Sequence, residues 1–190
     1  MSAHIALLRA VNVGGSTPVQ MAALRALLTQ MGFGEVRSLL HSGNLVFGSG
    51  SPGGSPLEPT LEAAIAKRFA VQIDVFVRTA SEWHAIVAQN PFPREAEQDP
   101  GHLVVTVLKG APSATAWKGL DAAIRGPEVV RGGGRHAYIV YPEGTGRSRL
   151  TLALIERQLG TRGTSRNWNT VTKLDVMASG TDGQRPPSGR

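Results

Sequence analysis

One order of apolar patterns occurs twice along this chain of 190 residues, and it limits the possible folds more than any other feature. Each copy begins with a strand-like apolar run and a helix-like run whose apolar residues lie three and four apart, followed by two more strands and a second helix. The first copy closes on a strand at 72–78, in which Ile73, Val75 and Val77 alternate toward one face. The order βαββαβ is typical of a ferredoxin-like unit with an antiparallel sheet. We therefore expect an α+β chain of two tandem ferredoxin-like subdomains.

In the first half, capping and turn residues separate the expected elements. Thr17 and Gln20 form a capping box at the start of the first helix, and Gly32 stops that helix. The stretch 48–59, rich in Gly, Ser and Pro, is expected to be a mobile loop. A second capping box, Thr79 to Glu82, opens a short helix. The expected strands are 4–13, 36–40, 45–47 and 72–78, and the two longer helices carry Leu24, Leu27, Leu28 and Met31 and then Leu61, Ile65 and Phe69.

The second half repeats the pattern up to its last strand. We expect a strand at 102–109, a helix marked by Trp117, Leu120 and Ile124, two strands around the glycines 132–134, and a helix at 150–159. A terminal helix at 166–177 is expected to replace the final strand. The expected boundaries are an N-terminal subdomain at 1–79, a helix and polar linker at 80–101, a second subdomain at 102–177 and a disordered tail at 178–190.

Composition places the chain among soluble globular proteins, with 41% apolar and 18% charged residues. The absence of cysteine excludes disulfides and thiolate metal sites. Arg9 ends the apolar run that starts at Met1, and no basic region precedes that run, so it does not resemble a secretory signal. No apolar stretch has the length of a membrane span. We therefore expect a cytoplasmic protein that does not associate with membranes.

The net charge of +6 is concentrated in residues 125–190, because basic and acidic side chains cancel in residues 1–124. A basic C-terminal half could attract phosphates or nucleic acid. The alternative is compositional, because most of the basic residues are arginine and Ala, Gly and Pro are abundant, as a GC-rich genome would produce.

The first candidate for a binding site is the segment that holds Arg9, Asn12, Gly14 and Gly15. A strand that passes through a glycine turn into a helix N-terminus exposes backbone N–H groups that favour an anion. Arg9 lies within an apolar strand, where its side chain must reach a carboxylate, a phosphate or solvent. The alternatives are a plain turn before a capped helix and a structural salt bridge of Arg9.

The second candidate, Ser42-Gly43-Asn44, could offer a hydroxyl and an amide to a ligand, although a β-hairpin turn explains it equally well. His41 does not form a base–nucleophile pair with Ser42, because adjacent side chains of a strand point to opposite faces.

The third candidate combines Arg166, Asn167, Asn169 and Thr170 around Trp168 at the start of a predicted helix. Asn167 or Ser165 could simply be the N-cap and Trp168 a core residue, but this segment holds more polar groups than one cap requires.

Other sequence patterns do not lead to a site. Gly48 to Gly53 matches the dinucleotide-binding glycine pattern, but no helix starts at its third glycine. None of the five histidines has the spacing of a metal site, so we expect no metal and no cofactor. Tyr138 and Tyr141 lie at odd spacing on one strand, unlike the aromatics of an RNA-binding sheet. No set of acid, base and nucleophile indicates a reaction, and enzymatic activity stays an open question.

Four motifs together resemble the bacterial family called domain of unknown function 1697, over about residues 3–177. The resemblance implies two tandem ferredoxin-like subdomains and no established activity, substrate or cofactor. This chain has Ala10 where the family usually has Gly, which we expect only to add a methyl group, and His41 where the family usually has Gln. Its loop at 48–59 is also longer. The motifs are Leu8-Arg9-Ala10-Val11-Asn12-Val13-Gly14-Gly15, Ser42-Gly43-Asn44, Asn90-Pro91-Phe92 and Arg166-Asn167-Trp168-Asn169-Thr170.

Three hypotheses for the function follow. The first is a site for a small anionic or phosphate-containing ligand, shared between the Arg9 segment and the Arg166 segment. The second is a nucleic-acid-binding module that uses the basic C-terminal half. The third is a structural role, in which the polar groups only fasten the two halves and bind no ligand. The oligomeric state is not indicated by the sequence.

Overall fold

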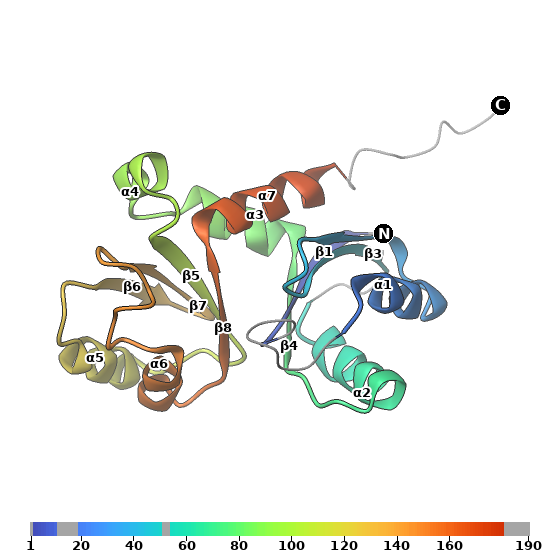
Figure 1. Cartoon of the computed structure of the whole chain (residues 1–190), viewed down its shortest axis with the longest axis horizontal. Helices are drawn as coiled ribbons and strands as arrows, with labels where there is room; N and C mark the ends of the chain where they lie inside the picture. The colour runs from blue at the N-terminus through green and yellow to red at the C-terminus, as the bar shows by residue number, and fades with distance from the viewer. Residues whose placement is uncertain (1, 11–18, 51–53, 181–190) are drawn as a thin grey trace. The chain divides into compact units, whose positions relative to one another are not determined.

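The structure, a computed structural model, describes residues 2–10, 19–50 and 54–180 and divides into two compact units. Unit 1 takes in the described residues up to Val87 and from Lys173 onward, and unit 2 spans Ala88–Thr172. Each unit has a four-stranded antiparallel sheet with helices between its strands (Figure 1).

In unit 1 the strand order is β2-β3-β1-β4, which is the ferredoxin-like order. The central strand β1 pairs antiparallel with both β3 and β4, so that Ile5 lies opposite Val46 on one side and Arg78 on the other. The expected order βαββαβ is confirmed. The elements are β1 (Ser2–Leu8), α1 (Met21–Gln30), β2 (Gly34–Leu39), β3 (Asn44–Ser49), α2 (Leu57–Phe69), β4 (Val75–Thr79) and α3 (Ala80–Ala88).

The core of unit 1 lies between its sheet and helices α1 and α2. Alternate residues of the strands point toward this core, as period-two patterns require. The expectation that Ile73, Val75 and Val77 face inward is confirmed, because all three are buried in this cluster. The other buried members include Ala6, Leu8, Leu45 and Phe47 from the strands and Leu24, Leu28, Leu61 and Ile65 from the helices.

Unit 2 repeats the topology with the order β6-β7-β5-β8, so the second copy is also a complete βαββαβ unit. The prediction that a helix replaces its last strand is wrong. Strand β8 is polar and has no apolar alternation to reveal it, but it pairs with β5, where Ser165 lies opposite Thr106. The elements are α4 (Pro93–Gln98), β5 (Leu103–Leu108), α5 (Ala114–Ala123), β6 (Val129–Gly133), β7 (His136–Val140), α6 (Leu152–Leu159) and β8 (Gly163–Asn167), followed by α7 (Trp168–Ser179).

The stretch predicted as a polar linker contains the short helix α4. Pro93 occupies its first turn, where a missing N–H costs nothing, and the N–H of Ala96 donates to the carbonyl of Phe92 at 3.0 Å. Its exposed, polar sequence has no apolar stripe, which is why periodicity did not indicate it.

Helix ends agree with several of the predicted caps. The Thr79–Glu82 capping box is confirmed, since the Thr79 N–H donates to Glu82 Oε2 at 2.8 Å and the Glu82 N–H to Thr79 Oγ1 at 3.1 Å. Gly32, the predicted stop, follows α1 with a φ of +89°, and Gly160 follows α6 with a φ of +64°. Thr17 lies outside the described residues, and α1 begins after Gln20, whose side chain makes no cap.

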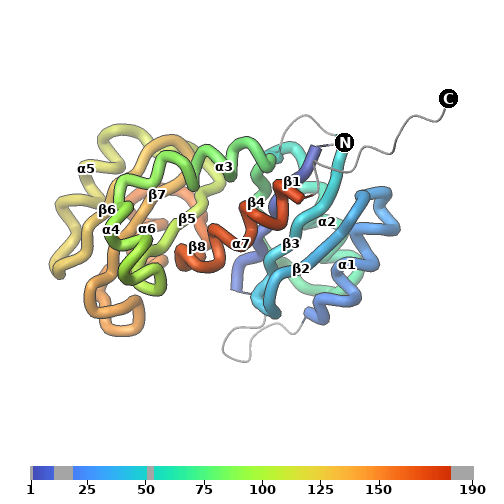
Figure 2. Tube along the Cα trace, turned by 90° about the horizontal axis from the view of Figure 1, so that it is seen from above, coloured from blue at the N-terminus to red at the C-terminus, as the bar shows by residue number. Residues whose placement is uncertain are grey.

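Helix α7 starts in unit 2 and ends in unit 1. Figures 1 and 2 show its C-terminal part beside the sheet of unit 1. There Arg37 Nη2 donates to the Met177 carbonyl at 2.6 Å, and His84 Nδ1 of α3 lies 3.3 Å from Asp175 Oδ2. Unit 1 is therefore built from both ends of the described chain.

Among the described residues, no helix is long and apolar enough to cross a membrane.

Candidate functional site

Arg9 lies in the turn directly after β1, whereas the sequence predicted a strand that continued to residue 13. Its backbone N–H donates to the carbonyl of Asp74 at 3.0 Å. Ala10 then adopts the left-handed conformation, with φ of +55°, which ends the extended strand. Asn12, Gly14 and Gly15 lie outside the described residues, so the structure describes only the first part of this candidate segment.

Ser42 and Asn44 form part of the β2–β3 hairpin. Asn44 is fully buried, and its Nδ2 donates to the Leu39 carbonyl at 3.1 Å and to Ser42 Oγ at 3.0 Å. Gly43 has a φ of +71°, and its carbonyl accepts from the N–H of Leu8 at 2.8 Å. These bonds hold the turn against β1 and support the hairpin interpretation of this motif.

The Arg166 segment crosses from β8 into α7. Arg166 Nη1 donates to Thr164 Oγ1 at 2.9 Å and to the Ser165 carbonyl at 2.8 Å, and burial lowers the pKa of Arg166 to about 10. Asn167 Oδ1 accepts from the N–H of Thr170 at 3.0 Å, so Asn167 is the N-cap of α7, one of the two alternatives from the sequence. Thr170 and Trp168 are buried, whereas Asn169 is exposed.

The structure brings the predicted residues together in two separate groups. Arg9, Ser42 and Asn44 belong to unit 1, and Arg166, Asn167, Asn169 and Thr170 belong to unit 2. The site shared between the two segments stays a prediction.

A pocket that the sequence did not indicate lies in unit 2, between α5 and β6. Its volume is about 330 Å³. Trp117 and Asp121 are four residues apart on α5 and therefore share one face of the helix, with Lys118 beside them. The lining residues are Trp117, Lys118 and Asp121 from α5 and Val130, Arg131 and Gly132 from β6.

The indole of Trp117 packs against the backbone at Gly132. A Cβ atom at residue 132 would collide with Cζ3 and Cη2 of that ring, so the six-membered ring lies directly against the strand backbone. Only glycine leaves room for this contact. The indole is partly exposed and also packs against the core cluster of unit 2. It therefore lies at the wall of the pocket, packed between the strand backbone and the core of unit 2.

Two cations and one carboxylate line the same pocket as this ring. Lys118 and Arg131 are exposed, and Arg131 Nη1 donates to the Val130 carbonyl at 2.9 Å. Since a guanidinium carries five N–H donors, this bond uses only one of them. Asp121 adds an exposed carboxylate on the helix side. The lining thus has a net positive formal charge and can hold an anion beside a flat apolar group.

The sequence does not indicate this pocket, because its residues have simpler interpretations. Trp117 marked the apolar side of a helix, and Gly132 was part of a turn. The signal that could have found it is a glycine within a strand, since such a glycine often marks the close approach of another group.

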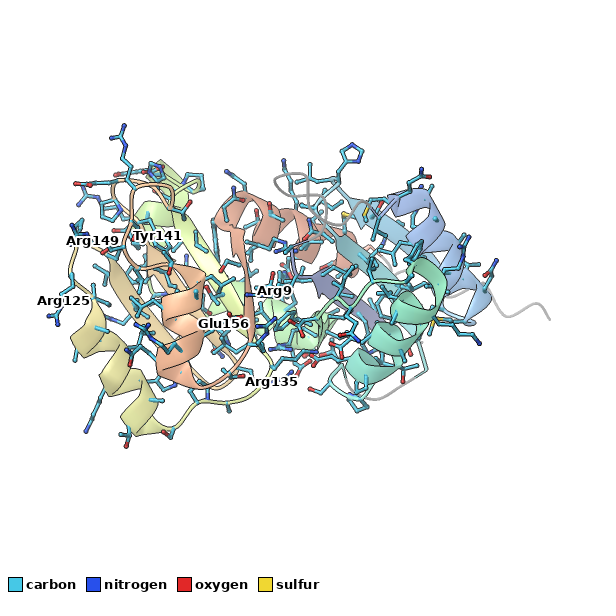
Figure 3. All side chains as sticks on the ribbon, turned by 60° about the horizontal axis from the view of Figure 1, so that its bottom comes forward. Arg9, Arg125, Arg135, Tyr141, Arg149 and Glu156 are labelled. Carbon is cyan, nitrogen blue, oxygen red and sulfur yellow. The ribbon has the colours of Figure 1, made fainter. Side chains whose placement is uncertain are left out.

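Other polar groups of unit 2 are used within the fold. Ser148 Oγ donates to Glu128 Oε1, which joins the loops that carry Arg125 and Arg149, and Figure 3 shows both arginines at the same end of the unit. Tyr141 Oη donates to the Leu150 carbonyl at 3.1 Å. Burial, and secondly the charge of Glu128, raises the pKa of Tyr141 to about 12, and burial raises the pKa of Tyr138 to about 12.

Comparisons with known proteins identify the family and the fold. A sequence profile of the family described as protein of unknown function (DUF1697) matches residues 1–138. Among solved structures, the chain is similar to the conserved bacterial protein SP0830 from Streptococcus pneumoniae, with 21% identity and a TM-score of 0.73 over 93% of this chain and 98% of that chain. The search of curated proteins found no match. At this identity the solved structure informs the fold alone, and it agrees with two tandem ferredoxin-like subdomains.

Proposed function

This chain belongs to the DUF1697 family of proteins of unknown function, and from its own geometry we propose that it binds a small anionic ligand of the phosphate-containing class. The observation that carries the proposal is the pocket of about 330 Å³ between α5 and β6, with Lys118 and Arg131 in its lining. An arginine fork and a lysine ammonium are the groups that proteins use to hold phosphate oxygens.

The wider charge distribution supports the same class of ligand. The net charge of +6 lies in residues 125–190, which include the arginine on β6. A positive surface raises the local concentration of anions and speeds their association. The Arg166 segment is a second candidate location for this chemistry, because a guanidinium held away from water interacts more strongly with an anion.

Nucleic-acid binding by the basic half is the second candidate function, and the same charge excess favours it. The two functions differ in their response to salt. Binding to many backbone phosphates weakens steeply with ionic strength, whereas a small anion in a pocket releases few counterions.

The test is calorimetric titration of the full chain with inorganic pyrophosphate at two salt concentrations. We expect Lys118→Gln combined with Arg131→Gln to weaken binding at least about tenfold, since each charge-assisted bond contributes roughly 1.5–3 kcal/mol. Arg149→Gln and Arg125→Gln together remove the same charge from residues that do not line the pocket, and we expect little change.

Equal losses in both double variants would show non-specific charge attraction and contradict the pocket. Loss of binding in Arg9→Gln or Arg166→Gln, with none in the Lys118 and Arg131 variant, would instead move the site to the segments predicted from the sequence.

A further inference from the structure

We infer that the ligand of the α5–β6 pocket is a mononucleotide, whose base stacks on Trp117 while its phosphate meets Lys118 and Arg131. This inference rests on the proposed function and adds the organic part of the ligand. Its first basis is size. The pocket of about 330 Å³ falls at the lower end of the range for small-molecule sites, and a single phosphate group would leave most of it empty.

The second basis is the indole of Trp117. Every nucleobase offers a flat face to an aromatic side chain, and such stacking is a common way to hold a base. Trp117 is suited to it because the indole lines the pocket and is partly exposed, while it packs against Gly132 and the core of unit 2. A ring that is already packed loses little conformational freedom when it binds.

The third basis is Asp121, which lies on the same helix face as Trp117. A carboxylate repels a bare phosphate, so a ligand that carries only phosphate gains least from this lining. A nucleotide also has hydroxyl and amine donors, which an ionised carboxylate accepts. The combination of two cations, one ring and one acceptor therefore fits a nucleoside phosphate better than an inorganic anion.

The test uses fluorescence and calorimetry of the full chain with AMP, adenosine and inorganic phosphate. The chain has three tryptophans, of which Trp83 and Trp168 are buried, so Trp117 is the one placed to report a ligand. We expect AMP to quench the emission and to bind at least about tenfold more tightly than phosphate or adenosine. We expect Trp117→Leu to weaken AMP binding about tenfold, in line with base stacking, and to leave phosphate binding unchanged.

Trp117→Phe keeps a ring and serves as the variant that is most compatible with the fold, with an expected loss smaller than that of Trp117→Leu. Asp121→Asn should weaken AMP binding and not phosphate binding. If phosphate binds as tightly as AMP and neither variant at Trp117 alters AMP binding, the inference is wrong while anion binding stands. If neither phosphate nor AMP binds, the mononucleotide is wrong, and if pyrophosphate does not bind either, the proposed anion binding fails as well. Binding of a single-stranded RNA oligonucleotide without binding of AMP also overturns the mononucleotide.

Discussion

Ala10 shows how one methyl group can matter at a turn. Its φ of +55° lies in the left-handed region, where the Cβ of an L-residue approaches the following carbonyl oxygen. A glycine at this position would avoid that contact. The expectation from the sequence, that Ala10 only adds a methyl group, therefore omitted the cost of the backbone conformation.

We predict that Ala10→Gly raises the free energy of unfolding by about 1 kcal/mol, because glycine adopts this conformation without steric cost. Urea denaturation followed by circular dichroism measures the change. The control is Ala63→Gly on the exposed side of helix α2, which should lower stability by about 1 kcal/mol because glycine is a poor helix former. A destabilised Ala10→Gly variant would contradict the assigned strain.

At the scale of the element, glutamate carboxylates accept hydrogen bonds from the outward backbone N–H groups of the edge strand β4. Three alternate backbone N–H groups of this strand each donate to a glutamate, and an exposed row of such groups would otherwise be able to pair with another chain. Glu62 Oε1 accepts from Val75 at 2.8 Å and Glu58 Oε1 from Val77 at 2.9 Å. Glu82 Oε2 accepts from the N–H of Thr79, which is also part of the capping box.

The first residue of the edge strand β8 in unit 2 also donates its backbone N–H to a glutamate. Glu156 Oε1 of α6 accepts from the N–H of Gly163 at 2.8 Å, as Glu62 of α2 does for Val75. In both units, the second helix therefore supplies a carboxylate to the first residue of the fourth strand. The repeat extends to this detail although the two edge strands have unrelated sequences.

We predict that Glu62→Ala lowers the free energy of unfolding by about 1–3 kcal/mol, because the Val75 N–H loses its acceptor. Glu62→Gln keeps an oxygen acceptor and should cost less. Urea denaturation measures stability, and hydrogen exchange at Val75 should speed up in the alanine variant. Equal costs for the two variants would show that the charge of Glu62, rather than the bond to Val75, is what matters.

At the scale of the whole molecule, three groups with shifted pKa values among the described residues couple stability to alkaline pH. Tyr138 and Tyr141 have pKa values of about 12 against an ordinary value of 10.0, so the folded state holds their protons longer than the unfolded state does. Their stabilising contribution is fully present below pH 10 and is lost as pH rises toward 12. Arg166 acts in the opposite direction, because its pKa falls to about 10.

We predict that the two tyrosine shifts outweigh the arginine shift, so that the free energy of unfolding falls between pH 10 and 12. Since the chain has only two tyrosines, absorbance at 295 nm reports both of them. At pH 11 about a tenth of the tyrosine should be ionised in the folded protein, and about nine tenths after unfolding in urea. Tyrosinate formation centred on pH 10 in the folded protein would contradict the burial of these hydroxyls.

The sequence by itself determined the two tandem ferredoxin-like subdomains, because apolar periodicity follows directly from which faces of helices and strands are buried. It also determined the local signals, such as the capping box at Thr79 and Glu82 and the glycine stop at Gly32, since these depend on residues close together in the chain. Asn167 was one of two caps that local reasoning left open.

Tertiary structure decided what depends on pairing across the fold. Strand β8 has no apolar alternation, and it exists because its backbone pairs with β5. Asn44 was equally consistent with a ligand and with a hairpin until its bonds to Leu39 and Ser42 were seen. The α5–β6 pocket depends on the contact between Gly132 of β6 and Trp117 of α5. The distance between these two elements is set by the packing of a helix on a sheet. Apolar periodicity in the sequence therefore does not predict this contact.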